Sequence, residues 1–552
     1  MVLPRLVPVL APKLAAALGA QSSYDGLLVI YSKLSSVLPA TTAGAFKPLA
    51  QVVQDASKAD ASFGKGVSFV CSPDAPGSRI VFSATGSLHG DVDDVRRYSD
   101  AARAGLARTR AAGVRRPIVL LCGTPSTGAS SVATARVKRD YAKFVEVTLL
   151  GLLAEAYQPL QTREHLRAQG KSEESFEEIG IAIEENSDEL AQQAVKFASA
   201  VEEGRRVAKD MGGADPERMT PLRAVEYVEA AFKGSDVSVT VMKDVDTIKK
   251  EYPMLHAVTR ASLVVPRHFP AVVKLEYHSP EPSAVKENIF LIGKGVTYDT
   301  GGLDIKAGGH MRGMSRDKCG ATACAGFLKT VSLLKPTHVN IVAELGFVRN
   351  SCGADGYVSD EIIVSRAGVR ALIGNTDAEG RMVMVDLLAA AKERALEPKY
   401  ASVPSHLFTV ATLTGHAVRA VGPYAIALGN GTSREHGIPD RLVKAGHVVG
   451  DPFELSTLRR EDYEFIAPGS STEDVVQAND LASTMTSRGH QFPAAFMAIA
   501  SGIAPHHDLD SEKPISYTHL DIAGSAEEGG KGLSLPAVTG SPVAALVQAF
   551  LV

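Results

Sequence analysis

The feature that most restricts the fold of this chain is a series of short, almost continuously apolar runs that alternate with helical patterns. In the second part of the chain the runs are ENIFLIGKG, HVNIVAELGFV, SHLFTVATLTG and SYTHLDIAG. Helical patterns separate them at residues 319–335, 382–396 and 491–504. Strands that are apolar on both faces and alternate with helices indicate a mostly parallel or mixed central sheet covered by helices.

The first part of the chain shows the same alternation over shorter stretches, with apolar runs GLLVIYS, SRIVFSA and RPIVLLCG and an Ala-rich helical pattern at 96–113. A chain of 552 residues also exceeds the size at which one hydrophobic core stops growing. We therefore expect a smaller α/β domain with connecting helices at 1–190 and a larger α/β domain at 205–552. The charged, proline-free segment 163–213 is expected to form the connecting surface helices.

Composition excludes several functional classes. A net charge of −4 gives no large basic field for nucleic acid or anionic membranes. The chain has no run of 18 uninterrupted apolar residues, so we expect no membrane span. The five cysteines are scattered without a CxxC pair and predict reduced, mostly buried thiols in the cytoplasm.

The amino-terminal stretch leaves a second localisation open. It is apolar and has no acidic residue before Asp25, as in organellar targeting peptides. Pro8, Pro12 and Lys13 interrupt any continuous apolar segment, and the following run at 25–32 resembles the first core strand. We therefore expect a cytoplasmic protein, with organellar targeting as the alternative.

Charged residues gather at one turn, NTDAEGR, which lies between a strand-like run and an apolar helical pattern. Asp377, Glu379 and Arg381 occupy alternate positions there. On an extended backbone alternate residues share one face, so the two carboxylates would converge. Converging carboxylates repel each other unless a cation or a shared proton compensates.

A second polar cluster lies in the glycine-rich stretch 291–323, which contains Lys294, Asp299, Lys306 and Asp317. Its glycine content is expected where the backbone approaches a ligand closely. A phosphate loop is disfavoured because the GxxxxGK[ST] pattern is absent. Together the two clusters supply four carboxylates near strand ends, which is what a two-metal site for Mg, Mn or Zn requires.

Other chemistries have less support in the sequence. The HExxH, GxSxG and GxGxxG patterns are absent. We expect His506 and His507 to face solvent. We expect Cys319 and Cys324 to lie on the apolar side of a helix, in the protein core. The loop GTPSTGASS at 123–131 lacks a lysine and is expected to be a connection.

The segments NTDAEGR at 375–381 and GKGVTYDTGG at 293–302 resemble the paired signature of the leucyl aminopeptidase family of dinuclear metallo-exopeptidases. Two further segments, at 410–420 and 518–526, are similar to later family motifs. The resemblance covers residues 205–552 and implies a metal-dependent enzyme that hydrolyses amino-terminal residues from peptides.

The resemblance also implies a role for each charged residue of the two clusters. The implied metal ligands are Lys294, Asp299, Asp317, Asp377 and Glu379. They would hold two divalent ions, chosen among Zn, Mn, Mg and Co, with Asp299 and Glu379 bridging and Lys294 binding as a neutral amine. A water molecule between the ions would attack the peptide carbonyl. Lys306 would stabilise the oxyanion, and Arg381 would hold bicarbonate or the substrate.

The same resemblance locates the substrate pocket. The matching pocket positions are Met314, Thr412, Leu413, Thr414 and Gly415, which imply a leucine-like first residue. The family also implies peptide substrates and a homohexamer, with no membrane partner. The chain departs from the family pattern at Lys318, which we expect beside the metals, and at VQANDLAS (476–483), and these departures affect substrate preference.

One alternative belongs to a different functional class. A regulatory protein of the same fold would contact nucleic acid or another protein through its first domain. Basic stretches at 110–116 and 135–139 are its sequence support, although such stretches are usually solvated faces. Nucleic acid is therefore not an expected partner.

Overall fold

The computed structural model describes residues 4–35, 37, 47–125, 131–183, 188–508 and 510–552. The chain divides into two compact units. The first unit comprises Met1–Glu203 with His447–Gly450, and the second comprises Gly204–Gly446 with Asp451–Val552. Within the described ranges, no helix is both long and apolar enough to cross a membrane.

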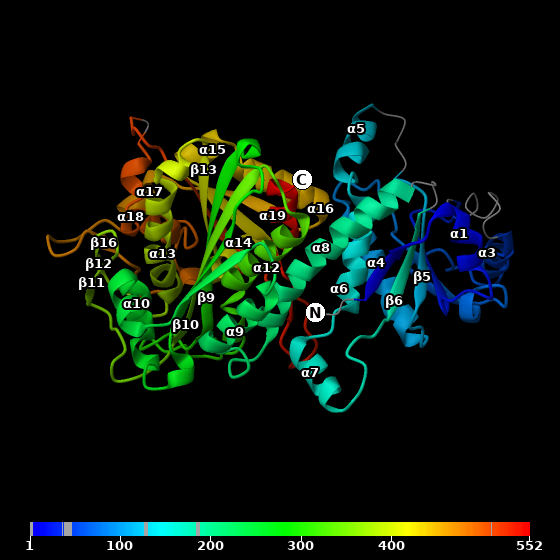
Figure 1. The fold of residues 1–552 in the computed structure, drawn as a ribbon, viewed down its shortest axis with the longest axis horizontal. Coiled ribbons are helices and arrows are strands. Elements are labelled where there is room, and N and C mark those ends of the chain that lie inside the picture. Colours follow the sequence, from blue (N-terminus) through cyan, green and yellow to red (C-terminus); the bar gives the residue numbers. More distant parts are fainter. Residues whose placement is uncertain (1–3, 36, 38–46, 126–130, 184–187, 509) are drawn as a thin grey trace. The chain divides into compact units, whose positions relative to one another are not determined.

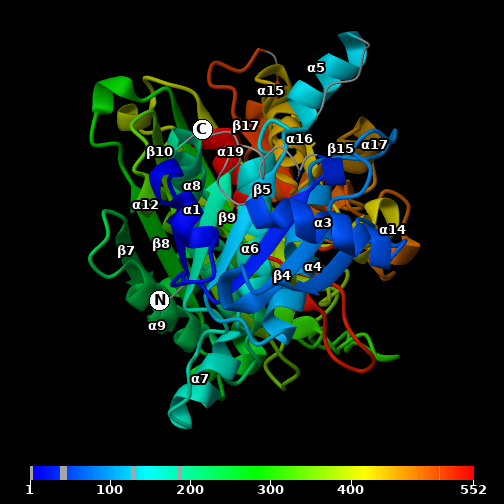
Figure 2. The same ribbon diagram turned by 90° about the vertical axis from the view of Figure 1, so that its right-hand side faces the viewer.

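The first unit is built on a six-stranded sheet, of which Figure 2 labels β4 and β5. In spatial order its strands are β1 (Arg5–Pro8), β6 (Glu178–Ile183), β5 (Pro117–Cys122), β2 (Gly26–Tyr31), β4 (Arg79–Ala84) and β3 (Val67–Cys71). All neighbours are parallel except β3 and β4. The expected α/β architecture of this part is therefore present.

Helices cover this sheet because its central strands are apolar on both faces. Leu27 and Val29 of β2 join a core cluster with residues of α1 (Ala11–Leu18) and α3 (Lys47–Ala59). Leu28, which points the other way, lies against Gly105 of α4 (Arg96–Ala111). Further helices among the described residues are α5 (Ser131–Asp140), α6 (Phe144–Ala156), α7 (Leu160–Ala168) and α8 (Asp188–Gly213), the last of which continues into the second unit.

The prediction of surface helices throughout 163–213 is wrong in its middle. Helices α7 and α8 account for its ends, but EIGIAI at Glu178–Ile183 is strand β6, almost wholly buried between β1 and β5. Six residues rich in isoleucine fit a strand with both faces covered better than a solvated helix. A further strand, β1, precedes the expected first core strand.

The second unit contains an eight-stranded sheet. In spatial order its strands are β15 (Phe453–Thr457), β14 (Ala425–Gly429), β17 (Ser516–Asp521), β13 (Ser405–Ala411), β9 (Glu287–Asp299), β10 (Val339–Asn350), β8 (Ala271–Tyr277) and β7 (Ser238–Met242). The central four, from β17 to β10, are mutually parallel, whereas β14, β8 and β7 run antiparallel to their inner neighbours. The predicted mixed central sheet is confirmed.

Figure 1 shows helices on both sides of this sheet, with α12 (Cys319–Leu334) on one side and α13 (Glu379–Ala395) and α18 (Phe492–Ala500) on the other. These three helices correspond to the three predicted helical patterns. Gly293 of β9 allows α12 to approach the sheet, because a Cβ atom there would lie 2.5 Å from the Cα of Ala321. The sheet is thus buried on both faces.

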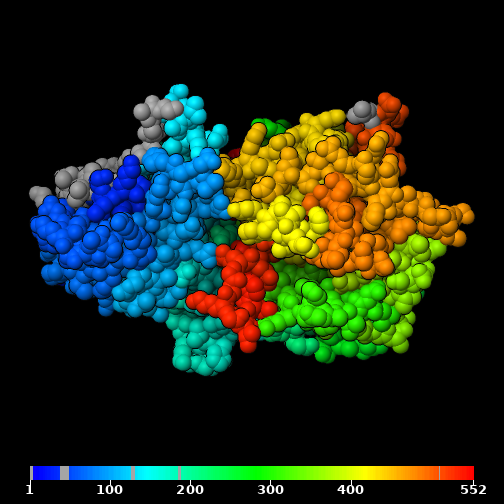
Figure 3. Space-filling view, turned by 180° about the vertical axis from the view of Figure 1, so that it is seen from behind, coloured from blue at the N-terminus to red at the C-terminus, as the bar shows by residue number. Residues whose placement is uncertain are grey.

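Shorter elements complete the second unit. The other helices are α9 (Pro221–Phe232), α10 (Val245–Glu251), α11 (Pro253–Thr259), α14 (Gly415–Val421), α15 (Gly431–Glu435), α16 (Ile438–Val449), α17 (Arg460–Glu464) and α19 (Val543–Phe550). A small sheet contains β11 (Ile362–Val364), β12 (Arg370–Leu372) and β16 (Val475–Val476). Strands β18 (Glu527–Glu528) and β19 (Ala537–Val538) form a hairpin. The carboxy-terminal part of the chain, coloured red, reaches the surface in Figure 3.

The packing of α12 on β13 gives a prediction about stability. A Cβ atom on Gly320 would lie 2.1 Å from the carbonyl oxygen of Val410, a backbone atom that cannot move aside without disturbing the sheet. We expect Gly320→Ala to destabilise the second unit by about 1–3 kcal/mol, as overpacked cores do. A lower thermal unfolding temperature would reveal it. The matched control is Gly213→Ala, whose Cβ has only an ordinary contact at 3.8 Å; equal melting temperatures for the two variants would contradict the prediction.

Candidate metal centre

The polar groups of the site gather at the carboxyl ends of the four central parallel strands. Strand β9 ends at Asp299, β10 at Asn350 and β17 at Asp521, and Thr412 directly follows β13. Ligands of open α/β sheets bind at this edge. The fold therefore brings together side chains that are far apart in the sequence.

The turn before α13 is held by the side chain of Gln477. Its Oε1 accepts hydrogen bonds from the backbone N–H groups of Gly374 and Asn375, and its Nε2 donates to the carbonyl oxygens of Asn375 and Ala378. Gly374 is required here because a Cβ would lie 1.8 Å from the carbonyl oxygen of Ala478. The turn is thus fixed by a segment about a hundred residues later in the chain.

The predicted strand-to-helix turn is present between β12 and α13, but the premise of an extended backbone across its charged residues is wrong. Asp377 lies in the turn itself, whereas Glu379 and Arg381 belong to the first turn of α13. The three side chains nevertheless line one pocket. Residues of a tight turn and of the helix that follows it can converge without sharing a strand face.

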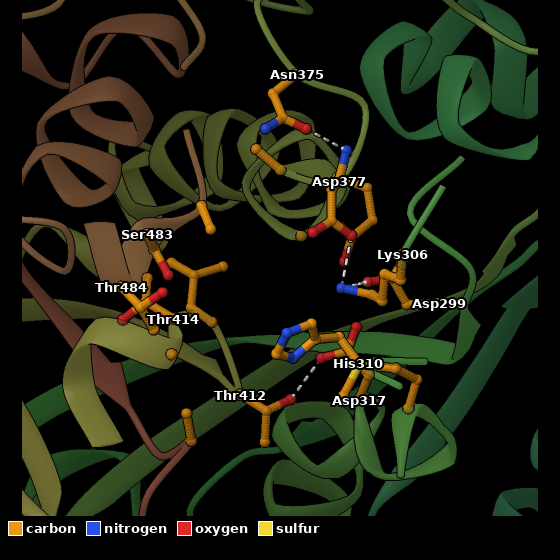
Figure 4. Close-up of a pocket in the computed structure, with 18 of the residues that line it drawn as sticks. Asp299, Lys306, His310, Asp317, Asn375, Asp377, Thr412, Thr414, Ser483 and Thr484 are labelled. Atoms are coloured by element: carbon orange, nitrogen blue, oxygen red, sulfur yellow. Dashed lines mark hydrogen bonds and ion pairs between the residues drawn. The ribbon is translucent and has the colours of Figure 1, made fainter. Parts of the chain in front are cut away.

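Two lysines pair with four carboxylates in the site. Lys294 Nζ lies 2.7 Å from Asp317 Oδ1 and 2.9 Å from Glu379 Oε1. Lys306 Nζ lies 2.9 Å from Asp299 Oδ2 and 2.5 Å from Asp377 Oδ1. Figure 4 shows Lys306 between Asp377 and Asp299. If all six groups are ionised, two negative charges remain uncompensated.

Burial and mutual repulsion make this cluster costly in its charged form. Burial, reinforced by Asp299, raises the pKa of Asp377 to about 6 and raises that of Glu379 well above its ordinary value. Burial acts to lower the pKa values of Lys294 and Lys306, but the surrounding carboxylates outweigh it and raise both. Additional positive charge would reduce the electrostatic repulsion among the carboxylates.

The residues present fit divalent cations. Asp299, Asp317 and Glu379 are buried, and each offers a carboxylate oxygen within 4.8 Å of the others. Asp317 Oδ2 is buried without a hydrogen-bond partner in the described part of the chain. A carboxylate-rich donor set with excess negative charge suits Mg, Mn or Zn.

Arg381 lies beside these carboxylates. Its NH1 donates to the carbonyl oxygen of Gln477 at 2.8 Å, and its guanidinium lies 4.9 Å from the ring centroid of Phe492. Burial lowers its pKa to about 10, which leaves it charged at neutral pH. The stacked guanidinium is therefore a fixed positive group in the pocket wall.

The cluster opens into a pocket of about 820 Å³. Every residue proposed from the sequence for metal binding, catalysis or substrate contact lines it: Lys294, Asp299, Lys306, Met314, Asp317, Asp377, Glu379, Arg381, Thr412, Leu413, Thr414 and Gly415. The structure thus brings these twelve residues together, while their individual roles remain predictions.

The loop after β13 is held in the pocket wall by Asp521. Its carboxylate accepts hydrogen bonds from the N–H of Leu413 and the hydroxyl of Thr414. Thr412 donates its hydroxyl to Asp317 Oδ1 at 2.9 Å, as Figure 4 shows. The loop therefore connects the substrate pocket directly to a candidate metal ligand.

Sequence reasoning missed several residues of the site. Asn350 donates to Asp299 Oδ1 at 2.8 Å, and its position at the end of a predicted strand was the available signal. His310, whose ring reaches into the pocket in Figure 4, Arg316 and Glu527 also line the pocket. Nothing in their local sequence distinguishes them from surface charges.

The expected place of Lys318 beside the metals is wrong. Its side chain is fully buried and donates to the carbonyl oxygens of Ala214 and Ser315, outside the pocket lining. Burial lowers its pKa to about 8. Lys318 therefore supports the turn that leads to Asp317 rather than facing the carboxylates.

Other expectations had mixed outcomes. Cys319 and Cys324 are buried on α12, as predicted, and Cys122 is buried too, whereas Cys71 and Cys352 are exposed.

His506 and His507 are partly buried rather than solvent-facing, and burial lowers the pKa of His507 to about 4. The two histidines have different partners, the carbonyl oxygen of Lys513 and the hydroxyl of Tyr463. The loop 123–131 lies largely outside the described residues.

Comparison with solved structures shows the same fold elsewhere. A Trypanosoma brucei leucyl aminopeptidase in complex with bestatin has a TM-score of 0.76 and 18% identity, covering 100% of this chain and 96% of that chain. The bottromycin maturation enzyme BotP in complex with Mn has a TM-score of 0.69 and 20% identity, covering 96% and 99%.

Sequence relatives give closer similarity. A Caenorhabditis elegans protein, provisionally named as aminopeptidase W07G4.4, is 40% identical over 449 residues, 81% of each chain. A Roseiflexus castenholzii protein, provisionally named as a cytosol aminopeptidase, is 29% identical over 74% of this chain and 75% of its own. The family model described as the cytosol aminopeptidase family, catalytic domain, matches residues 206–547. The predicted family is confirmed: this chain belongs to the cytosol aminopeptidase family, and it is a hydrolase of the metallo-exopeptidase class.

Proposed function

We propose that this enzyme removes amino-terminal residues from peptides with the help of two divalent ions held by Lys294, Asp299, Asp317, Asp377 and Glu379. The observation that carries this proposal is the convergence of four carboxylates, with excess negative charge, in one pocket at the carboxyl edge of the sheet. Zn, Mn, Mg and Co all suit such donors. When bound, the ions supply Lewis acidity and lower the pKa of a water molecule, which provides the nucleophile near neutral pH.

Lys306 is proposed to stabilise the transition state. Its ammonium group is largely buried and faces the candidate ligands Asp299 and Asp377. As the peptide carbonyl is attacked, negative charge develops on its oxygen, and Lys306 Nζ donates a hydrogen bond to that atom. A single donor of this kind contributes about 3–4 kcal/mol in known enzymes.

Arg381 is proposed to hold the group that receives the proton of the attacking water. A guanidinium that stays charged is a poor base, but it binds a small oxyanion such as bicarbonate through parallel N–H groups. NH1 of Arg381 is already committed to Gln477, which fixes the plane of the guanidinium. Holding the substrate directly is the alternative role.

The pocket also supports a preference for peptide ends. The negative charge left over in the cluster favours a free α-amino group, which internal peptide bonds lack. Met314 and Leu413 contribute apolar surface to the pocket lining, which suits leucine-like first residues. A homohexamer and a cytoplasmic location remain expectations from the family.

The alternative of a nucleic-acid-binding protein is less well supported. The arginines of its two basic stretches have acidic partners: Arg110 pairs with Glu155, Arg116 with Glu178, and both Arg136 and Arg139 pair with Asp140. Paired arginines leave little net charge for phosphates. We therefore do not propose nucleic acid as a partner.

The role of Lys306 can be tested with Lys306→Ala. We expect this variant to bind its metals but to lose about 100-fold or more in kcat, because the oxyanion loses its donor. Hydrolysis of leucine p-nitroanilide, measured with Mn, Zn, Co and Mg beside metal analysis, checks this. An unchanged kcat would refute the assigned role, and no turnover by the native enzyme with any metal would refute the proposed function.

Metal binding is expected to release protons. Lys294 is charged in its pairs with Asp317 and Glu379, so it must lose a proton before its amine can bind a cation. Titration calorimetry at pH 7 in buffers of different ionisation enthalpy should show release by the native chain and about one proton fewer by Lys294→Met. Affinity should fall as the pH drops through about 6, where Asp377 becomes protonated. Heats independent of the buffer would contradict this assignment.

The place of Lys294 depends on a glycine. A Cβ atom on Gly380 would lie 2.5 Å from Lys294 Cε and 2.7 Å from its Nζ. We expect Gly380→Ala to displace this side chain and weaken metal binding about 10–100-fold, as changes next to metal ligands do. The control is Gly431→Ala, also in the first turn of a helix, where a Cβ meets nothing within 4 Å. Equal metal affinities in both variants would show that Lys294 is not a ligand.

A further inference from the structure

The wall of the pocket contains a charged pair that the proposed mechanism does not use. Arg316 ends the short 3-10 helix Met314–Arg316, and Glu527 begins β18. Arg316 Nε lies 3.1 Å from Glu527 Oε1, and both residues line the pocket with Met314. The Arg316 side chain is 14% exposed and that of Glu527 is 31% exposed, so the carboxylate is the more accessible partner.

The guanidinium of Arg316 is occupied by the chain itself. NH1 donates to the hydroxyl of Ser315 at 2.7 Å, and NH2 donates to the carbonyl oxygen of Pro536 at 3.5 Å. Pro536 belongs to the loop between β18 and β19, and a second contact, from Arg312 to the carbonyl oxygen of Leu533, ties this loop to the same segment. NH1 and NH2 are thus each tied to the chain itself, and Nε, which is buried without a hydrogen-bond partner among the described residues, has Glu527 Oε1 as its ion-pair neighbour.

The carboxylate of Glu527 has capacity left. Its contact with Arg316 is the one ion pair that it makes to the described residues, and it accepts no side-chain or backbone hydrogen bond from them. A carboxylate accepts about four hydrogen bonds. Burial raises the pKa of Glu527 and Arg316 opposes that shift, so a second cation nearby would further favour the ionised form.

The pocket that contains Glu527 also has apolar and small residues in its lining. Met314, Leu413, Ala523 and Ala526 line the same pocket. The two alanines take up little of the pocket volume, and the larger two can cover methylene groups. Lysine and arginine side chains suit such a lining, because they bury an apolar stem while a polar partner holds the charged end.

We propose that the pocket accepts arginine or lysine as the first residue of the peptide, with its cation held by Glu527, in addition to leucine-like residues. This inference rests on the proposed aminopeptidase function. An acidic first residue is disfavoured, because Glu527 and the candidate metal ligands repel a further carboxylate. Glu527 is thus a specificity residue rather than a catalytic one.

Kinetics with a panel of aminoacyl p-nitroanilides tests the proposal, since all members share one leaving group. The native enzyme should cleave the arginine and lysine compounds as well as the leucine compound. In Glu527→Gln the ratio of kcat/KM for arginine to that for leucine should fall at least about tenfold, because a charged hydrogen bond is lost. The control Glu528→Gln alters the neighbouring exposed carboxylate, which does not line the pocket, and should leave the ratio unchanged.

A second variant tests the same pair in the opposite direction. Arg316→Met leaves Glu527 without its internal partner, so the ratio for arginine over leucine should rise. Cleavage of the leucine compound without the basic ones, a ratio unaffected by Glu527→Gln, or preference for a glutamate compound would each overturn the inference while leaving the proposed function intact.

A binding measurement tests the inference independently of whether the enzyme cleaves a compound. Calorimetry with arginine amide and leucine amide should show that Glu527→Gln weakens binding of arginine amide at least about tenfold relative to leucine amide. Equal effects on both amides would overturn the inference, whether or not the enzyme cleaves any compound. Absence of cleavage would instead refute the proposed function.

Discussion

The site depends on one electrostatic constraint, the burial of four carboxylates at a single edge of a parallel sheet. Asp299, Asp317, Asp377 and Glu379 would repel one another in a medium that screens charge weakly. Lys294 and Lys306 each bridge two of them and compensate only part of the charge. A site left negative in this way selects for cations. The same cations that reduce the repulsion among the buried carboxylates are those that the proposed chemistry requires.

The backbone that holds these carboxylates together comes from distant parts of the chain. The strands bring Asp299 and the loop at Thr412 to the same edge, and Gln477 fixes the turn that carries Asp377. Glycines at 293, 374 and 380 are needed because neighbouring atoms occupy the space of a Cβ. Close packing therefore explains these three glycines, whereas Gly301 and Gly302 of the first signature segment also adopt positive φ angles of 88° and 65°.

Much of this arrangement is predictable from the sequence. Apolar runs identified β9, β10, β13 and β17, and their polar ends indicated the metal cluster. The strand β6 was missed because its charged surroundings suggested helices. The strand-to-helix turn at Asp377 was predicted, but its charged residues converge from the turn and the start of α13 rather than from one extended face. The segment 476–483 was expected to affect substrate preference, but the role of Gln477 in holding the turn before α13 was not predicted, and Glu527 was not recognised, since only tertiary contacts bring these side chains to the site.

The most direct test of this account is a crystal structure of the enzyme with Mn²⁺, with the ions located by anomalous scattering. The account predicts two peaks per chain, both within bonding distance of oxygens from Asp299 and Glu379, and with Lys294 Nζ turned from its carboxylate partners towards one of them. A single peak elsewhere, or no peak with the lysine pairs unchanged, would contradict the assignment of this cluster as a two-metal centre.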